Sequence, residues 1–239
     1  MSSNAPSRPT VKQVSELTEE QLKSCVQLAS DAFGTNGAIY RILLVNYSHS
    51  EHVNLQNIDP SMSGTLGGDM SLKDELLTAM FRATLLEGRV YMVETEGEVA
   101  TICLLFRKPN SLFATETQRD LGFTEFFSKL SPETQNWWTH DYPAQMAEKE
   151  REIISQEEWD KMWYFSLVVT APKYQGQGFA SFFMDKFAEE TQNRGEVLGL
   201  STGLEVNVQK YESMKFRERG RITMKTVVNL FPCVWLTRG

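Results

Sequence analysis

The chain has 239 residues, with 31 acidic against 24 basic side chains and a formal net charge of -7. Hydrophobic residues make up 41% and charged residues 23%, which is typical of a soluble globular protein. The acidic balance argues against a nucleic-acid binder, because that function needs clustered Lys and Arg. No stretch reaches the roughly 20 consecutive apolar residues of a membrane span, so we expect no membrane partner.

The three cysteines are Cys25, Cys103 and Cys233. They lie far apart, their number is odd, and no pair has the C-x-x-C spacing, so neither a disulfide framework nor a zinc ribbon is indicated. We expect free thiols in a reducing compartment. The first residues also lack a basic stretch followed by an apolar one, and we therefore expect a cytoplasmic protein.

The N-terminal third predicts helices. Residues 1–14 are polar and predict a flexible lead-in. Thr18 is a plausible N-cap for an amphipathic helix that ends at Gly34, and the apolar stretch 38–47 predicts a second helix. Residues 61–69 are rich in Gly and Ser and predict a loop. Apolar spacing over 71–87 predicts a further helix, closed by Gly88.

Strand patterns begin after this helix. Residues 90–93 and 99–106 flank a short Gly-containing connection, which predicts an antiparallel hairpin. Residues 109–160 carry many aromatic side chains among charges and predict a helical insertion. These aromatics are interpreted as core packing, with the alternative that some of them line a substrate cleft.

The C-terminal part has the clearest order. We expect a strand over 163–170, a turn over 171–178, a helix over 179–193 and a strand over 197–202. A short helix over 207–213 and closing strands within 221–236 complete the chain. The whole of 15–239 is therefore predicted to form a single α/β domain.

The turn between that strand and its helix holds Gly176 and Gly178. Glycine permits a sharp bend and lets a ligand approach the backbone closely. The start of the following helix offers free N–H groups and the positive end of its dipole, so the turn can hold a pyrophosphate. The turn lacks the Gly-Lys-Ser/Thr of a P-loop and the full G-x-G-x-x-G of a dinucleotide fold.

The sequence Gln175-Gly176-Gln177-Gly178-Phe179-Ala180 resembles the Q/R-x-x-G-x-G/A signature of the GNAT superfamily of acetyl-CoA-dependent N-acetyltransferases. Downstream, the segment from Asn207 through Tyr211 to Phe216 resembles the family's N-x-x-x-Y-x-x-x-G-F segment. Lys215 departs from the usual glycine, which puts the local left-handed turn in question.

The resemblance implies a GNAT fold: a mixed, mostly antiparallel sheet of about seven strands, splayed at the cofactor site and flanked by helices, here with a helical insertion. It also implies acetyl-CoA as co-substrate and no metal. Backbone groups of Val168 and Thr170 would bind the pantetheine arm as an added strand does, and Asn207 would bind the pantetheine or the nucleotide end through its amide. The pyrophosphate would be held by backbone N–H groups of Gln175, Gly176, Gln177, Gly178, Phe179, Ala180 and Ser181.

The implied reaction is direct attack of a neutral amine on the thioester. The N–H of Val168 would stabilise the oxyanion, and Tyr211 would protonate the leaving thiolate. From its pattern alone, Tyr211 could instead be a packing residue and Asn207 a helix N-cap. Candidates for a general base are Glu205, His140 and Asp141, although a water chain could serve. His49 and His52 lack partners for metal ligation.

Three functions stay open at this point. The leading one transfers acetyl to a primary amine of a small molecule, and the net acidity slightly favours a cationic acceptor. The second is a protein lysine or N-terminal acetyltransferase, which would need an open groove for a peptide. The third is a non-catalytic CoA-binding module. The sequence predicts a monomer or a homodimer without choosing between them.

Overall fold

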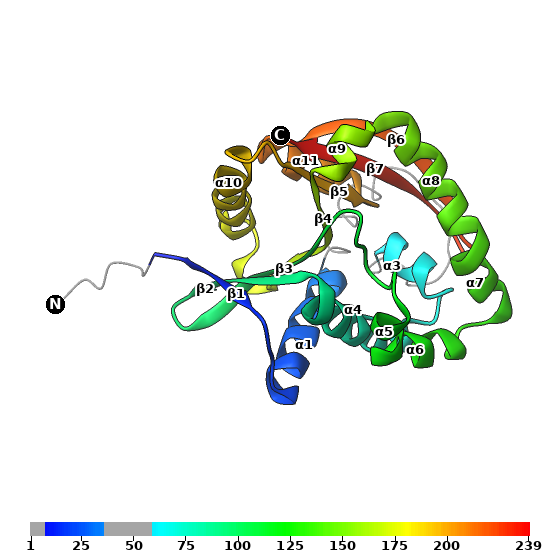
Figure 1. Ribbon diagram of the computed structural model, residues 1–239. Coiled ribbons are helices and arrows are strands. Elements are labelled where there is room, and N and C mark those ends of the chain that lie inside the picture. The colour runs from blue at the N-terminus through cyan, green and yellow to red at the C-terminus, as the bar shows by residue number, and fades with distance from the viewer. Residues whose placement is uncertain (1–7, 36–58) are drawn as a thin grey trace, which may run out of the picture.

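A computed structural model describes residues 8–35 and 59–239, and its centre is one seven-stranded sheet (Figure 1). The strand order is β1-β2-β3-β4-β5-β7-β6, and only β4 and β5 pair in parallel. The predicted mixed, mostly antiparallel sheet with flanking helices is thus confirmed. The strands are β1 (Thr10–Val14), β2 (Arg89–Thr95), β3 (Glu98–Arg107), β4 (Met162–Thr170), β5 (Val197–Thr202), β6 (Arg217–Lys225) and β7 (Leu230–Arg238).

The first strand corrects the predicted lead-in over 1–14. Residues Thr10–Val14 pair antiparallel with β2, from Thr10 beside Glu94 to Val14 beside Val90. Only Val14 in this strand is buried, so the strand is held mainly by backbone hydrogen bonds to its neighbour. A short edge strand of this kind has no hydrophobic pattern of its own, and for this reason the sequence did not reveal it.

Helices cover both faces of the sheet (Figure 1). α1 and α4 pack on one face, where buried side chains of β2, β3 and the end of β4 join them in one core. α10 packs on the other face over a second core that contains Phe183 and Phe187. The helices preceding β2 are α1 (Glu19–Thr35), α3 (Pro60–Thr65), η1 (Met70–Leu72) and α4 (Lys73–Glu87), and those following β4 are η4 (Pro172–Tyr174), α10 (Phe179–Gln192) and α11 (Glu205–Ser213).

The segment 61–69 is not the loop that its composition predicts. Asp59 caps the short helix α3 by accepting hydrogen bonds from the N–H groups of Ser61 (2.9 Å) and Met62 (3.3 Å), and Pro60 stands at its first position. An Asp-Pro pair at a helix start is the signal that outweighs the Gly and Ser content here. The predicted helix over 38–47 lies outside the described residues.

The predicted helical insertion is present between β3 and β4. Its aromatic residues are mostly packed: Phe126 and Trp137 are buried, while Trp138 is half-buried and donates through Nε1 to the carbonyl of Thr65 at 2.9 Å. The interpretation as core packing is therefore confirmed for these side chains. The helical segments are α5 (Glu116–Gln118), η2 (Arg119–Phe123), α6 (Thr124–Lys129), α7 (Pro132–Asn136), η3 (Trp137–Asp141), α8 (Tyr142–Ile153) and α9 (Gln156–Asp160).

The sheet opens in its middle, between β4 and β5. β5 pairs with β4 only over Met162–Phe165, while β3 stays paired with β4 as far as Thr170. Beyond Leu200, β5 continues on its other side beside β7. A register shift in the β3–β4 pairing falls at the same place, between Leu105 and Leu104. The predicted splay of the two central strands therefore begins at Ser166.

All three cysteines are buried and free, as expected from their spacing. Burial raises the pKa of Cys233 to about 12 and that of Cys25 to about 11, so neither thiol ionises readily. Across the part of the chain that the structure describes, no helix combines the length and the apolar character needed to span a bilayer.

Candidate functional site

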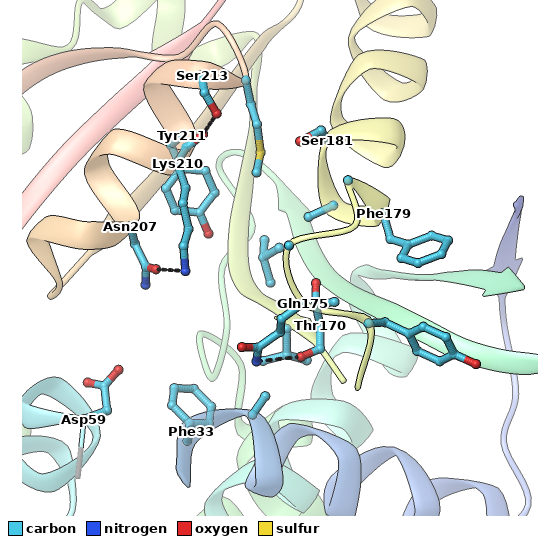
Figure 2. A pocket seen from close by; sticks show the side chains of 18 residues that line it. Phe33, Asp59, Thr170, Gln175, Phe179, Ser181, Asn207, Lys210, Tyr211 and Ser213 are labelled. Carbon is cyan, nitrogen blue, oxygen red and sulfur yellow. Dashed lines mark hydrogen bonds between the residues drawn. The ribbon is translucent and has the colours of Figure 1, made fainter. Parts of the chain in front are cut away.

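A cavity of about 320 Å³ lies where β4 and β5 separate (Figure 2). The start of α10 forms one wall, α11 forms the wall opposite, and the C-terminal part of α1 closes the base with Asp59. The lining residues are Ala32, Phe33, Asp59, Val168, Val169, Thr170, Tyr174, Gln175, Gly176, Gly178, Phe179, Ala180, Ser181, Asn207, Lys210, Tyr211, Ser213 and Met214.

The turn before α10 is shaped by two glycines with left-handed backbone. Gly176 has φ 76° and Gly178 has φ 83°, a region that other residues adopt only with strain. A Cβ built on either glycine would meet no atom within 4 Å. Both positions therefore need glycine for their backbone conformation, and both leave open space in which a ligand can reach the backbone.

The first turn of α10 presents unsatisfied donors to the cavity. Gly178 is the N-cap and supplies no side-chain acceptor, so the N–H groups of Phe179, Ala180 and Ser181 have no cap from it. These residues line the cavity. Together with the positive end of the helix dipole, they form a site suited to phosphate groups.

Two glutamines in the signature have different surroundings. Gln175 lines the cavity, and its Nε2 donates to the carbonyl of Thr170 at 3.1 Å, which ties the turn to the end of β4. Gln177 is not among the lining residues, and its Nε2 donates to the carbonyl of Lys173 at 2.8 Å. Its side chain therefore stabilises the turn from outside the cavity.

The open edge of β4 faces the same cavity. The N–H of Ala171 donates to the carbonyl of Ala100 on β3, and backbone groups alternate in direction along an antiparallel pair. The N–H groups of Val168 and Thr170 therefore point away from β3, toward the side that β5 has left. This geometry leaves an edge to which an extended amide chain can add as a strand does.

Asn207, Lys210 and Tyr211 approach from α11 (Figure 2). The helix begins at Glu205 with Leu204 as N-cap, so the alternative reading of Asn207 as N-cap was wrong. The Asn207 amide lies 3.4 Å from the Lys210 ammonium. Tyr211 is half-buried against the ring of Phe216, and desolvation raises the pKa of its phenol well above 10. That phenol remains a proton donor at neutral pH.

Lys210 and Asp59 are lining residues that the sequence did not single out. Partial desolvation lowers the pKa of Lys210, whose ammonium points into the cavity. Asp59 is buried and serves as the cap of α3. An exposed lysine on an ordinary helix gives no sequence signal. The Asp59-Pro60 pair does signal a helix cap, but it does not indicate that Asp59 lies near the cavity.

The three residues considered as a base do not line this cavity. Glu205 forms an ion pair with Arg221 at 3.1 Å, and His140 lies in the insertion, beside the hydroxyl of Thr139 at 2.8 Å. Asp141 is exposed on the same segment. His49 and His52 lie outside the described residues, and within 8–35 and 59–239 no three His, Cys, Asp or Glu side chains gather as a metal site would require.

Lys215 stands where the resembling motif has glycine, and it keeps the left-handed conformation with φ 68°. The turn geometry is thus preserved without glycine, at a cost in backbone strain. The N–H of Phe216 reaches the carbonyl of Tyr211 at 3.0 Å across this turn. The substitution therefore leaves the position of Tyr211 intact.

The chain resembles known proteins in its structure but not in its sequence. No model of a known protein family matches the chain. A search of curated proteins also gives no match. Solved structures do match over most of the chain.

The first is a protein described as arylalkylamine N-acetyltransferase 7 of the yellow fever mosquito, with 14% identity, a TM-score of 0.56, and coverage of 96% of this chain and 86% of that one. A second is a ligand-free variant of an agmatine N-acetyltransferase, with 8% identity, a TM-score of 0.52 and coverage of 96% and 98%.

A third match is a polyamine N-acetyltransferase of Drosophila melanogaster, an enzyme that forms N-acetylagmatine. It shares 10% identity and has a TM-score of 0.51, with 97% of this chain and 99% of that chain covered. Because the identities are this low, the likeness lies in the arrangement of strands and helices. Together with the splayed sheet, it establishes that this chain has the GNAT acetyltransferase fold.

Proposed function

We propose that the protein is an acetyl-CoA-dependent N-acetyltransferase that acts on a primary amine of a small molecule. One observation carries this proposal. The open edge of β4 is followed, through η4 and the glycine turn, by the N-terminus of α10, and Tyr211 faces that edge from α11. A strand edge followed by an anion site matches a ligand with an amide-containing arm and a pyrophosphate.

The residues present fit this co-substrate. The glycine turn and the N–H groups of Phe179 to Ser181 would hold the pyrophosphate. The backbone of Val168 and Thr170 would bind the pantetheine amides, with the Asn207 side chain as a further partner. Lys210 would add a positive charge on the same side. When bound, acetyl-CoA supplies the activated acetyl group.

The reaction then needs little from the protein beyond positioning and proton transfer. A neutral amine attacks the thioester carbonyl, and its nitrogen forms a bond to the acetyl carbon. The N–H of Val168 donates to the oxygen on which negative charge develops. As the carbon–sulfur bond breaks, Tyr211 gives its proton to the leaving thiolate. The attacking nitrogen gives up one proton to solvent and Tyr211 regains one from solvent, so the products are an amide and a free thiol.

A small acceptor is favoured over a protein. Helices of the insertion pack against the β6–β7 part of the sheet (Figure 1), so they cover strand surface on which an extended peptide could otherwise lie. The three structural neighbours are named for agmatine, polyamines and arylalkylamines. Those names concern small amines, and they support the same acceptor class for this chain.

The test uses the purified full chain. Calorimetric titration with acetyl-CoA should show binding at one site, and the thiol of CoA should be released when an amine from a small-molecule panel is added. A parallel panel of peptides should give no release above background. Failure to bind acetyl-CoA would refute the proposal. Binding without turnover on either panel would favour the non-catalytic module, and release with peptides alone would favour a protein acetyltransferase.

A further inference from the structure

A second cavity, of about 310 Å³, lies on the side of the insertion. It is enclosed by α8, by the end of β3 with the residues that follow it, and by the central strands. None of its lining residues belongs to the cavity described above. They are Phe106, Lys108, Asn110, Ser111, Leu112, Tyr142, Met146, Glu150, Tyr164, Phe165, Ser166 and Ser201.

This cavity reaches the point where the sheet opens. Ser166 follows Phe165, the last residue of β4 that pairs with β5, and Ser201 follows Leu200, the last residue of β5 that pairs with β4. Val168, which lines the first cavity, is two residues beyond Ser166, or about 7 Å along a strand. Both cavities therefore lie at the opening between β4 and β5. The first lies on the side of α11, and the second lies on the side of α8.

One carboxylate points to a ligand of defined charge. Glu150 on α8 lines the cavity, and among the described residues its side chain accepts one hydrogen bond, a long one of 3.4 Å from Nε1 of Trp235. A carboxylate can accept about four hydrogen bonds, so most of the accepting capacity of Glu150 remains available. No ion pair within 4.0 Å is found for it among the described residues.

The cation that Glu150 attracts, Lys108, is already held by two aromatic rings. The ammonium of Lys108 lies 3.9 Å from the ring centroid of Trp159 and 4.7 Å from that of Tyr164. Contact with two aromatic faces stabilises a partly desolvated cation. Burial lowers the pKa of Lys108 and raises that of Glu150, and the attraction between the two opposes both shifts.

The other walls are aromatic and apolar. Tyr164 donates to or accepts from the hydroxyl of Ser201 at 2.7 Å, which fixes its ring at the opening of the sheet. Tyr142 lies about two turns before Glu150 on α8, and burial raises the pKa of both tyrosines, so both stay neutral. With Phe106, Phe165 and Met146, these rings form an apolar surface next to a single accessible carboxylate.

We infer that this second cavity is the acceptor subsite, that it takes a primary amine carried on a small aromatic or alkyl body, and that Glu150 receives the ammonium group of that amine. The inference rests on the proposed function, because an acceptor must reach a thioester held at Val168. In that position Glu150 can also accept the proton that the ammonium must lose, leaving the neutral amine to attack.

The size and the charges favour a small amine over other acceptors. About 310 Å³ is at the lower end of the range for small-molecule sites, so the cavity has room for a small amine but not for the length of an extended peptide. An acceptor that carries a carboxylate instead of an apolar body would place its carboxylate near that of Glu150, with Lys108 as the one cation in the lining. Such an acceptor should bind less well. A neutral alcohol would leave Glu150 without its charged partner, so it should bind less well than the amine of the same shape.

The test compares Glu150→Gln with the wild type, using 2-phenylethylamine and n-hexylamine as probes and 2-phenylethanol as the neutral analogue. Amine binding is measured calorimetrically without cofactor, and KM and kcat are measured with acetyl-CoA. We expect the amine Kd and KM to rise about 10- to 100-fold in Glu150→Gln, as for loss of a charged hydrogen bond. Affinity for acetyl-CoA should be unchanged, and 2-phenylethanol should bind wild type and variant equally weakly.

The matched control is Glu152→Gln, since Glu152 is an exposed residue of α8 that pairs with Lys149 at 2.8 Å. It should behave as the wild type does. Tyr142→Leu provides a second variant, which should weaken 2-phenylethylamine more than n-hexylamine. Unchanged amine affinity in Glu150→Gln, or absence of amine binding by a wild type that binds acetyl-CoA, would overturn the inference. Amine binding by a protein that does not bind acetyl-CoA would instead refute the proposed function.

Discussion

The two cavities at the sheet opening are built in opposite ways. The cavity beside α10 offers backbone groups from one stretch of β4, the glycine turn and the first turn of α10, with side chains of α1 and α11 around them. The cavity beside α8 presents side chains, and these come from β3, β4, β5 and the insertion. A site made of backbone depends on local conformation, whereas a site made of side chains depends on tertiary packing. The first can be preserved in a divergent chain while the second changes its acceptor.

The largest expected effect is a loss of kcat, without a loss of acetyl-CoA affinity, when Tyr211 in the first cavity is changed. Tyr211→Phe should lower kcat by about 100-fold or more, because a general acid typically contributes at least that much. The Kd for acetyl-CoA should change less than about twofold. Steady-state kinetics and calorimetry measure the two quantities.

Tyr174→Phe is the matched control, since Tyr174 also lines the cavity but its hydroxyl bonds to Glu98 at 2.6 Å. It should retain nearly full kcat. Equal losses in the two variants would remove Tyr211 from the reaction and leave it as a packing residue.

The backbone character of the first cavity is tested at Gly178. Gly178→Val forces a branched side chain into left-handed backbone, which costs roughly 1 to 2 kcal/mol, and fills the space in front of the N–H groups. Loss of a charge-assisted hydrogen bond should weaken acetyl-CoA about 10- to 100-fold. Calorimetry and urea denaturation give the two effects separately.

Gly195→Val is the control for strain alone. Gly195 also has positive φ, at 63°, with no atom within 4 Å of a built Cβ, but it follows the far end of α10. It should lose similar stability and keep its affinity for acetyl-CoA. If both variants bind acetyl-CoA as the wild type does, the glycine turn is not the phosphate site.

The sequence predicted the first cavity but not the second, because the first is built largely from neighbouring residues and the second from residues far apart in the chain. A backbone site is encoded by neighbouring residues, so the glycine turn, the helix start and the Asn207–Tyr211 spacing are visible as a local motif. Glu150, Tyr164 and Ser201 are far apart in the chain, and none stands in an unusual local pattern. Their meeting results from packing of the insertion on the sheet, which periodicity does not predict. The edge strand β1 was missed because it gains its order from β2.

The attachment of the insertion is tested by an ion pair between α9 and β6. Glu158 lies 2.6 Å from Arg219, which also donates to the carbonyl of Ile153 at the end of α8. Hydrogen bonding from Arg219 lowers the pKa of Glu158 to about 2. The stabilisation is therefore present above the unfolded pKa of about 4.5, and it is lost as the pH falls toward 2.

Glu158→Gln should lose about 1 kcal/mol of stability at pH 7, since the pair is partly exposed, and clearly less at pH 2, where about half of Glu158 is protonated in the folded protein. The amine KM should rise a few-fold while the acetyl-CoA affinity stays constant. Urea denaturation across this pH range measures the first effect. Glu157→Gln, on the same helix but fully exposed, should leave the free energy of unfolding nearly unchanged. An equal change in both variants would show that the pair does not anchor α8.

The smallest expected effect is a gain of stability beside the first cavity. Lys215 holds φ 68°, so Lys215→Gly should relieve strain and stabilise the protein by up to about 1 kcal/mol. The lost contact of its ammonium with Asp185, 3.3 Å long and exposed, should offset little of this gain. Lys215→Ala removes the same contact but keeps a Cβ in left-handed backbone, so it should give no stabilisation in urea denaturation. If glycine and alanine behave alike, the turn carries no strain. If glycine stabilises but also slows turnover, then the strained turn positions Tyr211, and the backbone-built cavity depends on a side chain after all.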